Sequence, residues 1–115
     1  MSLLAVGQLL RVVDIVDLSC NNLGPEGAKV LALAISESVT LRKLNLSENR
    51  LGPEGSAIVA GAIESSSSLI QVDMRINELT PANEARLRRI CKERRKQRHR
   101  LDIHCDLKPT LIEYE

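Results

Sequence analysis

Aromatic residues are almost missing from this sequence, which has one Tyr and no Phe or Trp among 115 residues. Base stacking and aromatic anchoring both need such side chains, so single-stranded nucleic acid is a poor candidate ligand. Cysteine is also scarce, and Cys20, Cys91 and Cys105 form no CxxC pair and leave one thiol unpaired. This pattern predicts reduced thiols and a cytoplasmic location rather than a disulfide framework.

Long apolar runs are missing as well. No stretch approaches the roughly 18 residues needed to cross a bilayer. The first ten residues, MSLLAVGQLL, lack the basic start of a secretory signal. The length indicates one domain with a modest core and no second wall for a catalytic cleft. We therefore expect no enzyme activity, no cofactor, no metal site and no membrane partner.

The chain instead contains an internal repeat with a period of 28 residues. LRKLNLSENRLGPEG at 41–55 follows VDIVDLSCNNLGPEG at 13–27, and the full repeats to which they belong share twelve identities. A fourth copy is placed with Leu101, Ile103 and Asp106 at the positions of Leu44, Leu46 and Asn49. The single domain, 1–115, then divides into a partial helix over 1–12, repeats over about 13–40, 41–68 and 69–97, and a degenerate terminal repeat over 98–115.

Each repeat reads as a short strand followed by a helix. Leu44 and Leu46 are two residues apart and share the inner face of a strand, while Lys43 points outward. Asn49 and its equivalents Asn21 and Asn77 end the strands, where their amides can form a ladder that satisfies buried backbone groups. A Gly-Pro pair then starts a helix. In the first full repeat the helix buries an apolar face made of Ala28, Leu31, Ala32, Ala34 and Ile35.

The L-x-x-L-x-L-x-x-N-x-L pattern over nearly the whole chain resembles the ribonuclease-inhibitor-like class of leucine-rich repeats. The inhibitor shares this class with nucleotide-sensing innate-immunity receptors, the activator of the Ran GTPase and several axonemal proteins. The resemblance implies an α/β fold, a right-handed β-α solenoid with a parallel sheet on its concave face. It also implies a non-enzymatic protein-interaction module or scaffold, with cytoskeletal or ciliary association as one setting.

The repeat pattern extends into the first residues. Leu3, Leu4 and Val6 match helical positions of the next repeat, so the chain is expected to start inside a helix. This favours the C-terminal piece of a longer array; the alternative is a natural short protein whose first helix is its cap. An uncapped N-terminal edge would also allow self-association.

Outward strand positions give the expected contact surface for a protein partner. In the fourth repeat they are taken as Arg100, Asp102, His104 and Cys105, and one column, Asp17-Asn45-Asp73-Asp102, forms an acidic stripe. The stripe is interpreted either as a docking site for a basic segment or as an ordinary solvated face. The residues expected to bind a partner are Asp17, Lys43, Asn45, Glu48, Gln71, Asp73, Arg75, Arg100, Asp102 and His104.

Three arrangements on this surface could carry chemistry, and none of them is the leading interpretation. His104, Asp102 and Cys105 are close in sequence, but adjacent strand residues point to opposite faces and no second wall excludes water. A zinc site built on His99, His104 and Cys105 would need outside ligands. Arg50 follows a strand as an arginine does in the Ran-GTPase activator, yet Asn49 before it is already explained by the ladder, so GTPase activation is a lesser alternative.

The largest departure from the repeat is a basic segment over 86–100, with nine basic residues and one acid, a charge of +8, against −7 for the rest of the chain. It is interpreted as a solubilising last helix, a site for an acidic partner such as a tubulin tail, or a patch for RNA, another polyanion or nuclear import. Electrostatic RNA binding through this segment is the main alternative function. Its candidate residues are Arg88, Arg89, Lys92, Arg94, Arg95, Lys96 and Arg98.

Overall fold

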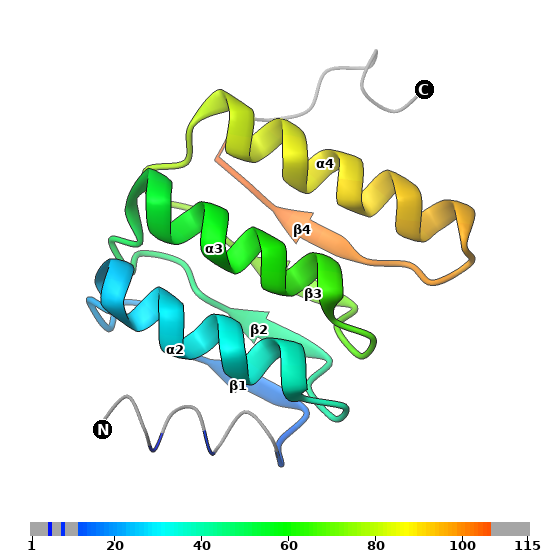
Figure 1. Ribbon diagram of the computed structural model, residues 1–115, viewed down its shortest axis with the longest axis horizontal. Coiled ribbons are helices and arrows are strands. Elements are labelled where there is room, and N and C mark those ends of the chain that lie inside the picture. Colours follow the sequence, from blue (N-terminus) through cyan, green and yellow to red (C-terminus); the bar gives the residue numbers. More distant parts are fainter. Residues whose placement is uncertain (1–4, 6–7, 9–11, 107–115) are drawn as a thin grey trace.

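The computed structural model describes residues 5, 8 and 12–106, in which strands and helices alternate. The four strands form one parallel sheet in chain order. The helices lie side by side over one face of this sheet (Figure 1). This arrangement confirms the predicted β-α solenoid. The elements are β1 (Ile15–Asp17), α2 (Gly24–Glu37), β2 (Lys43–Asn45), α3 (Gly52–Ser65), β3 (Gln71–Asp73), α4 (Pro81–Lys96) and β4 (Asp102–His104).

The predicted partial helix over 1–12 lies almost wholly outside the described residues, although Ala5 and Gln8 within it are helical. The fragment hypothesis and self-association through an N-terminal edge therefore stay predictions. Residues 107–115 of the predicted terminal repeat also lie outside the described part. Within the ranges that are described, no helix is long and apolar enough to span a membrane.

The core lies between the sheet and the helices. In the first three strands, the central residue is buried and the first residue is exposed, as the two-residue periodicity predicted. The helices close this layer with Leu31, Ile63 and Leu87, all fully buried. The predicted apolar face of α2 is confirmed, since Ala28, Leu31, Ala34 and Ile35 are buried and Ala32 packs against the core.

Paired residues are 28 apart in sequence between β1 and β2 and between β2 and β3, but they are further apart between β3 and β4. Leu44 pairs with Val72, whereas Val72 pairs with Ile103, 31 residues on. The predicted alignment, with Leu101 at the position of Leu44 and Ile103 at that of Leu46, is therefore wrong by two residues. The reason is extra chain between the strands: α4 has 16 residues, whereas α2 and α3 have 14 each.

The predicted asparagine ladder is present. Asn77 is fully buried; its Nδ2 donates to Leu46 O at 2.8 Å, and its Oδ1 accepts from Asn49 N at 2.9 Å. Asn49 repeats the pattern one coil earlier with Leu18 O and Asn21 N. Asp106 does not take the next ladder position, because its Oδ1 accepts from Ile76 N at 2.8 Å. Among the described residues, the ladder therefore ends at Asn77, and Asp106 binds the backbone amide of the residue before Asn77.

Candidate functional site: the outward strand columns

Two columns of outward side chains cross the sheet, and the strand register defines them. The first column is Ile15, Lys43, Gln71 and Asp102, and the second is Asp17, Asn45, Asp73 and His104. We call these eight residues the concave face. Neighbouring strands of a sheet lie about 4.8 Å apart, so side chains within a column are close enough to contact one partner together.

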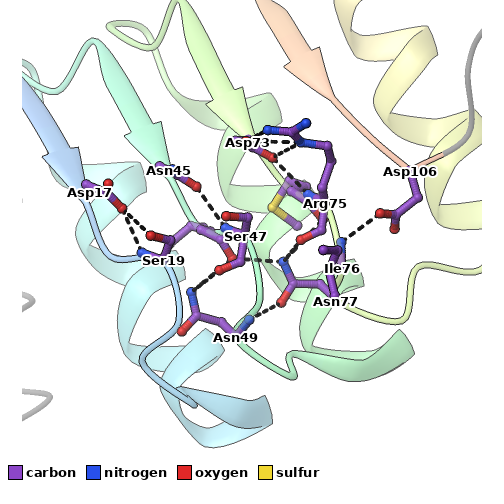
Figure 2. Close-up of polar contacts among 12 residues, drawn as sticks. Asp17, Ser19, Asn45, Ser47, Asn49, Asp73, Arg75, Ile76, Asn77 and Asp106 are labelled. Carbon is purple, nitrogen blue, oxygen red and sulfur yellow. Dashed lines mark hydrogen bonds and ion pairs between the residues drawn. The ribbon is translucent and has the colours of Figure 1, made fainter.

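The second column is held by a repeated turn (Figure 2). Asp17 Oδ1 accepts hydrogen bonds from Ser19 N at 2.9 Å and Ser19 Oγ at 2.6 Å. Asn45 Oδ1 accepts from Ser47 N at 3.0 Å. Asp73 Oδ1 accepts from Arg75 N, also at 3.0 Å. Because one oxygen of each of these three side chains accepts from the backbone two residues on, the polar groups of Asp17, Asn45 and Asp73 are preorganised rather than mobile.

The predicted acidic stripe is interrupted in the structure. Asp73 forms an ion pair with Arg75, with 2.7 Å between Oδ2 and Nη2, and Figure 2 shows the guanidinium folded onto the carboxylate. His104, not Asp102, stands beside Asp73, since the fourth strand is shifted. Asp102 joins the first column and pairs with Arg100, at 3.2 Å. Asp17 is left as the one acid of this column without an ion pair among the described residues.

Both aspartates of the second column are ionised near neutral pH. At Asp17, the hydrogen bonds from the Ser19 hydroxyl and amide lower the pKa of the carboxyl. Partial burial pushes the pKa of Asp73 upward, but the hydrogen bonds and charge of Arg75 outweigh it and leave the pKa lowered. The column therefore carries two fixed negative charges, of which the one at Asp73 is locally neutralised.

A groove that the sequence did not reveal lies at the ends of the strands. It has a volume of about 470 Å³ and is lined by Cys20, Asn22, Glu48, Arg50 and Ile76. All five residues have left-handed backbone conformations, with φ between 50° and 59°. Such conformations are unusual for a β-branched residue, and the Ile76 side chain is 59% exposed. The residue types do not predict these left-handed conformations, because the turn at the end of each strand imposes them.

The surroundings of Cys20 and Cys105 keep both thiols protonated. Cys105 was predicted to point outward, which is wrong: it packs against the core, and burial raises its pKa to about 12. The Cys20 thiol donates to Glu48 Oε2 at 3.0 Å, and this hydrogen bond raises its pKa. Both thiols stay protonated at neutral pH and are poor nucleophiles. Within the described residues, no three His, Cys, Asp or Glu side chains gather as a metal site.

The basic segment divides into structural and exposed residues. Arg94 was predicted as a surface residue, but it is only 8% exposed. Its Nη2 donates to Ile63 O at 3.2 Å and Glu64 O at 2.9 Å, and also to Ser66 O. These carbonyls end α3, where a helix leaves acceptors unpaired and favours a cation. Arg94 therefore caps the neighbouring helix and is unavailable to a partner.

Arg94→Met is expected to destabilise the chain by about 2 kcal/mol, because Met covers the same apolar surface but leaves the α3 carbonyls without their charged donor. Arg95→Met, one residue along on the exposed side, should change the free energy of unfolding by less than about 0.5 kcal/mol. Urea unfolding followed by circular dichroism measures both. Equal losses for the two variants would show that Arg94 does not cap α3.

The other basic residues of α4 differ in their contacts. Arg86 donates to Ala57 O at 3.2 Å and pairs with Glu64, so it ties α4 to α3. Arg88 lies 3.9 Å from the buried Glu84 carboxylate. The remaining basic residues of α4 are exposed, and with Arg98, which follows the end of the helix, we call them the basic surface: Arg89, Lys92, Arg95, Lys96 and Arg98.

The coil geometry and the repeat pattern together define the fold. A family model described as Leucine Rich repeat matches residues 10–32 and 37–56, which cover most of the first two full repeats. Together with the parallel sheet and the helices that alternate along the chain, these matches fit a β-α leucine-rich repeat solenoid. None of the curated proteins compared with the chain matches it significantly. Leucine-rich repeat domains generally mediate protein–protein interaction, and the family is typically non-enzymatic.

Proposed function

We propose that this chain is a protein-interaction module of the ribonuclease-inhibitor-like class, which binds one protein partner through the concave face. The repeat period of 28 residues, with one strand and one helix per repeat, supports that subclass. A cytoplasmic setting is part of the proposal, in keeping with free thiols at Cys20, Cys91 and Cys105. The partner is a folded protein or segment able to contact several coils at once.

One observation carries the proposal: three of the four residues of the first column are exposed and are not used in contacts within the chain. Ile15, Lys43 and Gln71 are exposed on adjacent strands, and their side chains form no hydrogen bond or ion pair with any other described residue. An apolar, a cationic and an amide side chain in one line suit a mixed protein contact. The second column beside it is already ordered by its turns, which reduces the entropy lost on binding.

The test is a triple variant, Ile15→Ala with Lys43→Ala and Gln71→Ala, compared with the unchanged chain. A partner is first isolated by affinity capture, then purified, and its dissociation constant is measured by calorimetry. The triple variant is expected to bind at least about tenfold more weakly, because three contacts on adjacent strands are lost together. Stability should hardly change, since all three residues are exposed.

A matched control changes one cationic, one apolar and one small polar residue on the helix side: Lys29→Ala with Leu33→Ala and Ser65→Ala, all at exposed positions. Its affinity should stay within about twofold of the unchanged chain. If this control lost binding and the concave triple did not, the partner would dock on the helices and the proposed contact surface would be wrong.

GTPase activation is not supported by the position of Arg50. Its left-handed backbone recurs at Asn22 and Glu78, the corresponding residues of the neighbouring coils. The conformation therefore belongs to the turn of every coil and does not single out an arginine for catalysis. RNA binding would involve a different surface, the basic surface on α4.

A further inference from the structure

We propose that the basic surface of α4 is a second binding site, separate from the concave face, for an acidic and extended segment of a protein. Arg89, Lys92 and Arg95 form its centre, with Lys96 and Arg98 beside them. All five side chains are exposed. The surface lies on the helix layer, whereas the concave face is formed by the strands (Figure 1). The two sites can therefore be tested independently.

The repeat provides an internal comparison for these charges. At the position of Lys92, α3 has Glu64 and α2 has Ser36. Both counterparts are exposed, as Lys92 is. At the position of Arg95, the preceding repeats have Ser67 and Val39, again exposed. The other coils thus have neutral or acidic residues at these sites. The repeat pattern therefore does not account for the positive charge on α4.

The acids of α4 do not neutralise the surface. Glu84 is buried and lies near Arg88, and Glu93 pairs with Lys96 at 3.4 Å. Arg89, Lys92, Arg95 and Arg98 have no ion pair within the described part of the chain. In α2, by contrast, the exposed Lys29 is paired with Glu26 on the same helix. The surface therefore presents several cations whose nearest counter-charges would come from another molecule.

The chemistry of the surface favours an acidic protein segment over two other anionic partners. The chain has no Phe or Trp, so bases of single-stranded nucleic acid have no stacking platform. The apolar residues of α4, Leu87 and Ile90, are buried, so the helix has no apolar face to insert into a membrane.

The length of the site also fits an extended peptide. Arg89, Lys92 and Arg95 are three residues apart, so the outer two are separated by about 9 Å along the helix axis. Four residues of an extended chain span about 10 Å from first to last. A short acidic segment could therefore lie along the three cations and form charge-assisted hydrogen bonds with them.

The experiment uses the full chain and a fluorescein-labelled peptide of alternating Glu and Ser, about twelve residues long. Binding is followed by fluorescence anisotropy at about 0.15 M salt, where surface charges are screened beyond about 8 Å. The unchanged chain should bind the peptide, and Arg89→Gln with Lys92→Gln and Arg95→Gln should weaken binding at least about tenfold. Thermal melts of the variant should match those of the unchanged chain, because the three sites are exposed.

A control of equal charge change separates the site from a general effect of net charge. It carries Lys29→Gln, Arg42→Gln and Arg50→Gln, three exposed cations outside α4, and should bind the peptide within about twofold of the unchanged chain. Equal weakening by both variants would overturn the proposal, as would absence of peptide binding. Tighter binding to a 20-base-pair RNA duplex, or to vesicles containing phosphatidylserine, would also overturn it in favour of that partner.

Discussion

Replacing Leu44 with Asp is expected to unfold the chain. Leu44 is the central residue of β2, is 3% exposed, and lies in the layer between the sheet and the helices. A carboxylate there would be buried without a partner, at a cost comparable with the whole stability of a small domain. Circular dichroism should then show no cooperative thermal transition, and little helix, at 25 °C.

The neighbouring substitution Lys43→Asp is the control, since Lys43 begins the same strand on its exposed side. The free energy of unfolding should change by less than about 0.5 kcal/mol. If the two variants were equally destabilised, the inward and outward assignment of the strand would be wrong. The residues of the concave face would then have to be reassigned.

Asn77→Ala is expected to have the second largest effect, a loss of about 3 kcal/mol of stability. The side chain is fully buried and donates to Leu46 O and Met74 O, while its Oδ1 accepts from Asn49 N. Alanine removes these partners and leaves backbone groups buried and unsatisfied, each at about 1–3 kcal/mol before relaxation. The midpoint of urea unfolding should fall while the slope stays constant.

Asn21→Ala tests whether burial or residue type causes this loss. Asn21 makes the same kind of bond, from Nδ2 to Leu18 O at 2.8 Å, but is exposed. Water can replace a lost partner there, so the variant should lose about 1 kcal/mol or less. A loss at Asn21 as large as that at Asn77 would mean that the amides matter for the conformation of the turn and not for satisfying buried groups.

The repeat made most of the fold predictable from the sequence. Because strand side chains alternate, Leu44 and Leu46 were assigned inward and Lys43 outward from their spacing alone, and the structure agrees. The ladder at Asn49 and Asn77 followed from the same period. A repeated pattern is informative in this way because each coil tests the interpretation of the previous one.

The errors came where the repeat changes. The helix α4 is two residues longer than α2 and α3, and together with the turn that follows it this shifts β4. As a result, His104 rather than Asp102 stands beside Asp73. Sequence spacing cannot reveal how much of an insertion continues a helix. Arg94 was misassigned for another reason: among nine basic residues in one segment, composition does not show which one turns inward to meet unpaired carbonyls. The Asp73–Arg75 pair likewise depends on rotamers.

The arrangement of the elements has a consequence for how the chain folds. Strands and helices contact their counterparts in the adjacent coil, as α2 contacts α3 and α3 contacts α4. Between the described elements, no contact therefore needs the chain to close a loop much longer than one repeat. Folding can start in any pair of adjacent coils and spread along the array, and the entropy lost at each step is that of a short loop.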